Sequence, residues 1–137
     1  MPKNEINLVS QALQDQLACM SDPEPGKALK ALQVHGFIGQ KPKISIDGMN
    51  IYAVLKPLTV FGFRVLEVSG WEPNGDSSLF WRGPGTAPPL NILAVVDGVP
   101  SVVKAEIQKR VGAAPLVSKA TYSNYPKSAS EITCFGK

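Results

Sequence analysis

The hydrophobic and polar residues of segment 44–55 alternate with a period of two, which is typical of β-strands with one buried face. Asp47 and Gly48 interrupt this alternation, and both suit the positive φ angles that a two-residue type I′ turn requires. The pattern therefore predicts a β-hairpin in which Ile44 lies opposite Ile51. We expect the buried face of the hairpin to carry Ile44, Ile46, Met49, Ile51, Ala53 and Leu55. The wetter face would then carry Ser45, Asn50 and Tyr52.

Two helices are predicted before this hairpin, over residues 4–20 and 22–35. Asn4 is a suitable N-cap for the first helix, whose apolar residues recur every three or four positions. The second helix opens with Asp22 and Pro23 and ends before Gly36, which suits the left-handed position after a helix. The predicted apolar face of the first helix is formed by Ile6, Val9, Leu13, Leu17 and Met20.

A third helix and several further strands are predicted after the hairpin. Residues 100–111 form the helix, with proline at its start and Gly112 as its stop. In segment 58–68 the alternation changes phase, which indicates a bulge or bend near Gly62 or Leu66. The segments with the composition of strands are 58–68, 78–82, 90–96, 116–123 and 130–135.

These elements predict an α+β fold with a mainly antiparallel sheet of five to six strands, packed against two N-terminal helices and one later helix. Segment 90–122 is a strand, a helix and a strand, so a mixed sheet with a parallel pair is also compatible. The length of 137 residues and the hydrophobic content of 44% indicate one domain with a single core. The domain comprises a helical pair (1–40), hairpin and meander strands (43–96), and a helix with closing strands (100–137).

The hydropathy pattern gives an expectation for the location of the protein. No apolar run reaches the ~20 residues that a membrane-spanning helix needs. The first residues lack the basic segment and apolar core of a secretory signal. We therefore expect a complete, soluble protein of the cytoplasm that does not act at a membrane.

The net charge of +3 is modest, but the basic residues are unevenly distributed along the chain. Segment 27–66 carries Asp47 as its only acid against six bases, which are Lys27, Lys30, Lys41, Lys43, Lys56 and Arg64. Such a segment can form a basic patch, and a nucleic-acid-binding or regulatory module is therefore one alternative function. A solvated surface without a partner is the competing interpretation.

Candidate catalytic residues are few. The chain has no nucleophile-elbow, phosphate-loop or zinc-protease motif. We expect Cys19 and Cys134 to be reduced, because a disulfide between them would need an oxidising compartment. Together with the single histidine, His35, they cannot supply a standard zinc site, and His35 is placed to stabilise a helix C-terminus. We expect no enzymatic activity, metal or cofactor, and a small hydrolase that uses Cys134 and His35 is the remaining alternative.

Segment 80–89 stands out because its glycines and prolines exclude regular structure. Trp81 and Arg82 lie at its start, and tryptophan and arginine often dominate protein interfaces through stacking and bidentate hydrogen bonds. The predicted binding residues are Trp81, Arg82, Pro84 and Thr86. A rigid connection with Trp81 buried beneath it is the structural alternative. The favoured function is a small non-enzymatic binding or adaptor module that recognises a protein through the Trp81–Pro89 loop, with a homodimer as one option for its oligomeric state.

Overall fold

The computed structural model describes residues 3–46, 48–75, 78–81, 87–112, 116–120 and 128–136, with side chains from Leu8 onward. The helices in this part of the chain are α1 (Lys3–Leu17), α2 (Pro25–Val34) and α3 (Pro100–Val111). The strands are β1 (Ile44–Ile46), β2 (Met49–Ala53), β3 (Thr59–Val60), β4 (Phe63–Trp71), β5 (Asn91–Asp97), β6 (Leu116–Lys119) and β7 (Ala129–Phe135).

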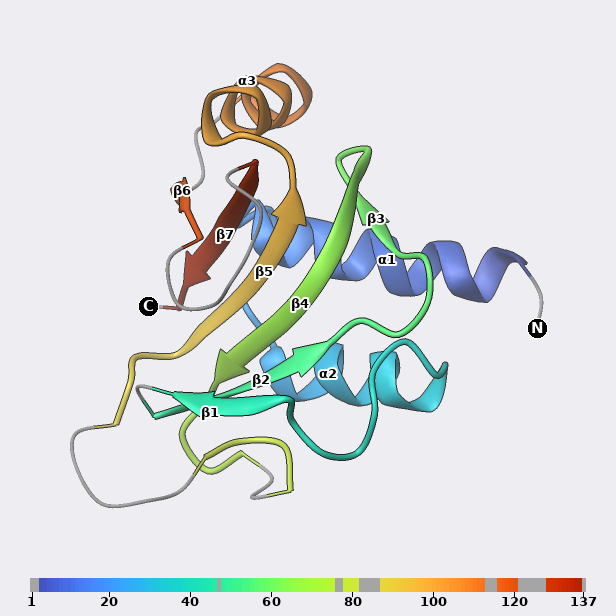
Figure 1. Cartoon of the computed structure of the whole chain (residues 1–137), viewed down its shortest axis with the longest axis vertical. Coiled ribbons are helices and arrows are strands. Elements are labelled where there is room, and N and C mark those ends of the chain that lie inside the picture. The colour runs from blue at the N-terminus through green and yellow to red at the C-terminus, as the bar shows by residue number, and fades with distance from the viewer. Residues whose placement is uncertain are drawn as a thin grey trace.

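The described strands form one antiparallel sheet in the order β1-β2-β4-β5-β7-β6, and β3 pairs with β4 outside this path (Figure 1). The predicted α+β fold with two N-terminal helices and one later helix is therefore confirmed. The parallel pairing of neighbouring strands that remained possible for segment 90–122 is not formed by β5 and β6. Strand β7 lies between β5 and β6 and runs antiparallel to both.

Helices α1 and α2 cover one face of the sheet, and in Figure 1 they lie behind it while α3 lies at its upper end. Helix α1 contacts β3, β5 and β7, and α2 contacts β4. A row of side chains on this covered face crosses β2, β4, β5 and β7, and each is fully buried: Tyr52, Val68, Ala94 and Ile132. The main hydrophobic core lies between this row and the helices.

The predicted hairpin and its register are confirmed, because Ile44 pairs with Ile51. The predicted buried face is wrong. The helices cover the face that carries Asn50 and Tyr52, whereas Ile44 remains 43% exposed on the opposite face. Leu55, expected on the buried side, is 66% exposed. Only Ile51 of the expected apolar face is buried as predicted, with 2% of its surface accessible, and Ile46 and Met49 are half-buried.

The polar face can be buried because its polar atoms have partners. The Tyr52 hydroxyl donates to the carbonyl of Leu79 at 2.7 Å, and the Asn50 side-chain amide donates to the same carbonyl at 3.2 Å. The Ser45 hydroxyl donates in turn to Oδ1 of Asn50 at 2.6 Å. These bonds offset the cost of removing the polar atoms from water, while the tyrosine ring contributes a large apolar surface to the core.

The predicted helices form, with shifts at their ends. Helix α1 ends at Leu17, so Met20 lies beyond it and is 60% exposed instead of belonging to its apolar face. Helix α2 begins at Pro25, three residues after the predicted cap Asp22. The left-handed stops are confirmed at Gly36 (φ 76°) and Gly112 (φ 75°).

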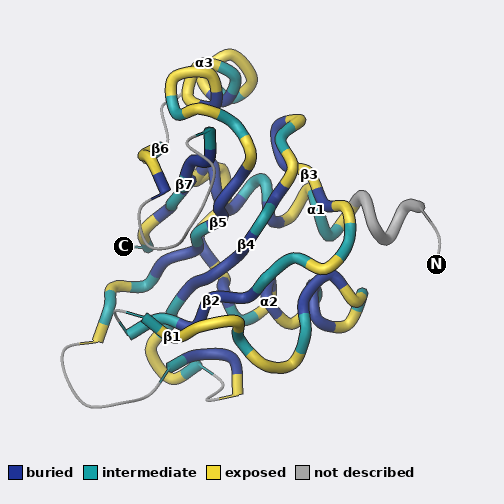
Figure 2. Tube along the Cα trace, in the orientation of Figure 1, coloured by how far each residue is buried: buried dark blue, intermediate teal, exposed yellow. Residues whose placement is uncertain are grey.

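Segment 58–68 contains both a turn and a bulge. Phe61 and Gly62 have positive φ angles of 53° and 82° and connect β3 to β4. The pairing of β4 with β5 shifts between Val65 and Glu67, which confirms the predicted irregularity at Leu66. Figure 2 shows the result for the sheet, in which the central strands are largely buried and the edge strands β1 and β6 are more exposed.

Candidate binding loop

The Trp81–Pro89 loop connects the segment after β4 with the start of β5. Trp81 is half-buried, which lies between the two alternatives that the sequence left open for it. The three other predicted binding residues, Arg82, Pro84 and Thr86, lie outside the described residues. The ends of the loop are described, with Pro88 half-buried and Ala87 and Pro89 exposed.

Both ends of the loop are held by one cross-strand pair. Trp71 at the end of β4 lies directly opposite Asn91 at the start of β5. The indole Nε1–H of Trp71 donates to the carbonyl of Trp81 at 3.2 Å. The side-chain amide of Asn91 donates to the carbonyl of Pro89 at 2.7 Å. The two ends therefore meet at neighbouring residues of the sheet, as in compact loops whose ends lie close together.

The turn of the β1–β2 hairpin provides a third support for the loop. A side chain on Gly48 would place its Cβ 3.5 Å from Cδ of Pro88 and 3.7 Å from Cε3 of Trp81. The Trp81 ring and the Pro88 ring therefore lie close to the backbone of the turn. Gly48 itself has a φ of 79°, so glycine is suited both to the turn and to this close approach.

Trp81 is thus half-buried, with its ring beside the Gly48 turn. An aromatic side chain that is held by its surroundings loses little conformational entropy when a partner covers it. Trp81 can thus act as an apolar anchor for a partner.

Models of known protein families, curated proteins and solved structures all fail to match this chain. Function therefore has to be inferred from the residues of the chain itself.

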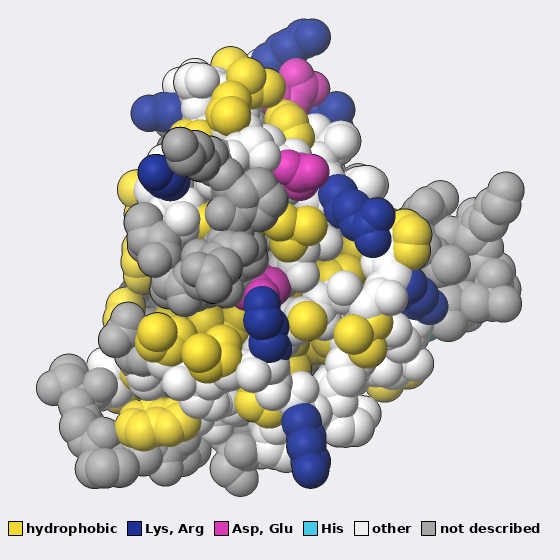
Figure 3. Space-filling view, viewed as in Figure 1, with side chains coloured by type: hydrophobic (Ala, Val, Ile, Leu, Met, Phe, Trp, Pro, Cys, Tyr) yellow, Lys and Arg dark blue, Asp and Glu magenta, His cyan; other side chains and the backbone are white. Residues whose placement is uncertain are grey.

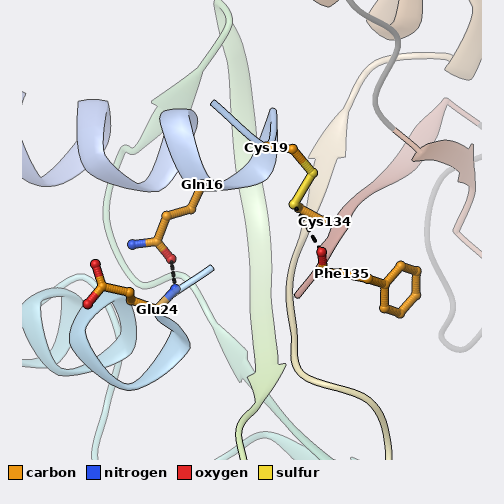
Figure 4. The surroundings of a disulfide bond; sticks show 5 residues. All are labelled: Gln16, Cys19, Glu24, Cys134 and Phe135. Atoms are coloured by element: carbon orange, nitrogen blue, oxygen red, sulfur yellow. Dashed lines mark hydrogen bonds between the residues drawn. A yellow bond between two sulfur atoms is a disulfide. The ribbon is translucent and has the colours of Figure 1, made fainter. Parts of the chain in front are cut away.

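The expectation of two reduced cysteines is wrong. Cys19 and Cys134 form a disulfide with their Cα atoms 5.6 Å apart, and it joins the residues just after α1 to strand β7 (Figure 4). Cys134 belongs to the covered face of the sheet, since it lies opposite Ile92 in the register of β5 and β7, and this places it beside the end of α1. The hydrolase alternative needs a free thiol on Cys134, and the disulfide leaves none.

His35 lies where the sequence predicts, at the C-terminal cap of α2, and its backbone N–H donates to the carbonyl of Ala31 at 3.0 Å. Among the described residues, no three histidine, cysteine or acidic side chains are grouped so that they could hold a metal ion. Within the same residues, no helix combines the length and apolar character needed to cross a membrane.

Some of the bases in segment 27–66 have partners within the chain. Lys27 pairs with Glu24 at 3.0 Å on α2, and Lys43 pairs with the buried Glu67 of β4. The ammonium of Lys56 lies 4.6 Å from the ring centre of Phe37. Three of the six bases thus have partners within the chain, and the nucleic-acid alternative stays a prediction.

A cavity of about 340 Å³ lies between the start of α2 and the end of β4. No feature of the sequence indicated this cavity. One hydrogen bond beside the cavity joins Glu72, just after β4, to the start of α2. Oε1 of Glu72 accepts the backbone N–H of Gly26 at 2.5 Å. The residues that line it are Pro23, Glu24, Gly26, Lys27, Glu72, Pro73 and Leu90. Glu72 is engaged with the helix and Glu24 pairs with Lys27, so both carboxylates of the cavity have partners within the chain.

Proposed function

We propose that this protein is a small non-enzymatic binding module that recognises a protein partner through the Trp81–Pro89 loop. The observation that carries this proposal is the anchoring of both loop ends by Trp71 and Asn91. A loop that only connects two strands does not need such a base, because glycine and proline already permit its path. A loop that presents side chains to a partner gains affinity from it, because less freedom is lost on binding.

Trp81 and Arg82 are the proposed contacts, and Pro84 and Thr86 shape the loop between them and β5. Trp81 supplies apolar area at the anchored end of the loop. Arg82 supplies a charged group that can bind a carboxylate with two hydrogen bonds. Residues of these two types commonly account for most of the free energy of a protein interface.

The compartment of the protein is part of this proposal. The sequence leads us to expect the cytoplasm, and that expectation stays a prediction. The disulfide favours an oxidising compartment instead, because cytosolic thiols are kept reduced. The partner should then be sought among proteins of the compartment in which the disulfide persists.

Capture of the partner with matched variants tests the proposed function. Tagged wild-type protein, Arg82→Ala and the control Lys109→Ala are incubated with native lysate under non-reducing conditions, and the retained proteins are quantified. We chose Lys109 because it is an exposed base on α3, away from the loop. We expect one retained protein to be depleted about tenfold or more by Arg82→Ala and unaffected by Lys109→Ala.

The melting temperature of each variant decides how a loss is interpreted. An unchanged melting temperature for Arg82→Ala assigns the loss to contact with the partner. If capture and melting temperature fall together, the loop has a structural role and the proposal is wrong. Equal capture by all three proteins also contradicts it.

A further inference from the structure

The disulfide joins two cysteines that lie in different surroundings. Cys19 is exposed in the connection between α1 and α2, whereas Cys134 is only 2% exposed and belongs to the main hydrophobic core. The three residues that follow Cys19 along the connection, Met20, Ser21 and Asp22, are exposed as well. A thiol from another molecule can therefore approach the bond from the side of Cys19, while the core shields Cys134.

The bond lies on the helix side of the sheet. Cys134 belongs to the face that α1 covers, and Figure 4 shows the two sulfur atoms bridging the end of that helix and strand β7. Figure 3 views the opposite face, on which hydrophobic and charged side chains are interspersed. We therefore expect a partner that reacts with the disulfide to approach from the side turned away from the viewer in Figure 3.

Cys19 occupies a backbone position that usually belongs to glycine. Its φ is 59°, in the left-handed region that residues with a Cβ rarely adopt. The backbone N–H of Cys19 donates to the carbonyl of Gln16 at 3.1 Å, and the N–H of Met20 donates to the carbonyl of Asp15 at 2.8 Å. This is the Schellman pattern of a helix end. The disulfide helps to hold the Cys19 side chain in this disfavoured conformation, so opening the bond removes a restraint on an exposed residue.

Cys134 is held by the sheet instead. It lies opposite Ile92 of β5, and the preceding residue, Thr133, lies opposite Leu116 of β6, so β7 is paired on both sides. When the bond opens, Cys134 keeps its place in the core while Cys19 is free to turn toward a partner. Cys134 is then positioned to attack the sulfur of Cys19 again, because the folded chain places their Cα atoms 5.6 Å apart.

We propose that Cys19 is the residue through which a dithiol oxidoreductase opens and forms this disulfide, and that Cys134 is the resolving residue. In the opening direction, a thiolate of the oxidoreductase attacks Sγ of Cys19. A bond forms between these two sulfur atoms and the Cys19–Cys134 bond breaks. Its electron pair leaves on Sγ of Cys134, which takes a proton from water. The second thiolate of the oxidoreductase then attacks the first sulfur of the same enzyme and releases Cys19 as a thiolate. The dithiol is thereby oxidised to a disulfide, and both cysteines of this chain are reduced.

Formation of the bond follows the same steps in reverse, with an oxidised oxidoreductase as the electron acceptor. The thiolate of Cys19 attacks the disulfide of the oxidoreductase, and Cys134 then attacks Sγ of Cys19 and displaces the reduced enzyme. Both directions therefore pass through a mixed disulfide at Cys19. This site is separate from the Trp81–Pro89 loop and does not depend on the function proposed for that loop.

Attack on Cys134 is the competing route, and two effects act on it in opposite directions. It would release the thiolate of the exposed Cys19, which water solvates better than a thiolate left in the core. An incoming thiol would first need the core around Cys134 to open, however, because that residue is 2% exposed. Exchange requires access to the attacked sulfur, so we expect access to decide in favour of Cys19.

Trapping of the mixed disulfide tests the proposal on the intact protein. Oxidised wild-type protein is incubated with thioredoxin whose second active-site cysteine is replaced by serine, acid stops the exchange, and free thiols are alkylated. Trypsin cleaves after lysine and arginine, so Cys19 falls in fragment 4–27 and Cys134 in fragment 128–137. We expect mass spectrometry to find thioredoxin linked to fragment 4–27 at least about tenfold more often than to fragment 128–137. The same reaction in urea is the control for the fold, and there both fragments should be linked.

Two single-cysteine variants form a matched pair for a second measurement. Cys134→Ala leaves the Cys19 thiol and Cys19→Ala leaves the Cys134 thiol, so both lack the disulfide. Each variant is checked for folding by circular dichroism, and its reaction with the chromogenic reagent dithiobis(nitrobenzoate) is timed with and without urea. We expect the fold to slow the Cys134 thiol about a hundredfold or more and to leave the Cys19 thiol within about threefold of its rate in urea.

Several results would overturn the proposal. Thioredoxin linked mainly to fragment 128–137 in the native protein would assign the exchange to Cys134. The same distribution of links with and without urea would show that the fold does not select a sulfur, and a mixed disulfide that forms only in urea would show that the native bond is closed to exchange. Equal slowing of the two single thiols would also contradict it. Arg82→Ala should change neither measurement, so this test and the test of the loop can fail separately.

Discussion

Trp71 and Asn91 lie directly opposite each other on β4 and β5, and each donates a side-chain hydrogen bond to one end of the Trp81–Pro89 loop. The loop therefore takes its position from the sheet as well as from its glycines and prolines. Because the two donors belong to neighbouring strands, any change that alters the pairing of β4 with β5 would also move the base of the loop.

Replacement of Trp71 by phenylalanine tests this anchoring. Trp71→Phe keeps a large aromatic ring but removes the Nε1–H that holds the Trp81 carbonyl. We expect the free energy of unfolding in urea to fall by about 1–2 kcal/mol, from the lost hydrogen bond and the smaller ring. The control Trp81→Phe keeps its backbone carbonyl and hence this hydrogen bond, so it should cost less. A larger effect of the control would show that the Trp71 indole does not anchor the loop.

For the β1–β2 hairpin, the sequence predicts the register of the strands but not which face is buried. The alternation and the Asp47–Gly48 turn predict the register of β1 and β2, because these are local properties of the chain. They do not decide which face the helices cover. One partner that allows the polar face to be buried is the Leu79 carbonyl, which lies 27 residues from Tyr52 and accepts a hydrogen bond from its hydroxyl. A polar face with such partners can be buried, and a count of apolar side chains misses them.

Alanine substitutions on the two faces of β1 and β2 check this correction. Tyr52→Ala removes a fully buried ring from the main core and should lower the free energy of unfolding by about 3–5 kcal/mol. Ile44→Ala on the face opposite the helices should cost less than about 1 kcal/mol, because Ile44 is already 43% exposed. Urea unfolding measures both values. Comparable costs at the two positions would mean that the two faces are buried alike.

Removal of the disulfide tests the link between α1 and β7. The bond closes a loop between residues 115 positions apart, and chain entropy assigns about 4–5 kcal/mol to such a closure. We expect the double variant Cys19→Ala and Cys134→Ala to lose about 3–5 kcal/mol of unfolding free energy in urea. Reduced wild-type protein keeps both sulfur atoms and should come within about 1 kcal/mol of the double variant. A wild-type midpoint that reductant leaves unchanged would contradict the assigned role of the bond.

The sequence could not predict the disulfide, nor the hydrogen bonds from Trp71 and Asn91 that hold the ends of the loop, and the physical reason is the same for both. Each depends on residues that are distant in the chain and become neighbours only through the sheet. Cys134 reaches Cys19 because β7 is inserted between β5 and β6, an order that no local pattern specifies. The loop itself could be found from its composition, and Trp81 could be chosen as a candidate. The roles of Trp71 and Asn91 follow only from their pairing.

The contact between Glu72 and Gly26 gives a prediction in which two effects oppose each other. Oε1 of Glu72 accepts the Gly26 N–H at the N-terminus of α2, so Glu72→Ala should cost about 1 kcal/mol of unfolding free energy. In Gly26→Ala, the better helix propensity of alanine is worth up to about 1 kcal/mol. The added Cβ would overlap Oε1 of Glu72, however, and would displace the carboxylate.

The double-mutant cycle separates these two effects. In the wild-type background, gain and loss should nearly cancel, and Gly26→Ala should change the unfolding free energy by less than about 0.5 kcal/mol. In the Glu72→Ala background there is no carboxylate to displace, so Gly26→Ala should stabilise the protein by up to about 1 kcal/mol. Urea unfolding of the four proteins measures the coupling. Equal stabilisation in both backgrounds would show that the carboxylate of Glu72 does not cap α2, because the coupling energy would then be zero.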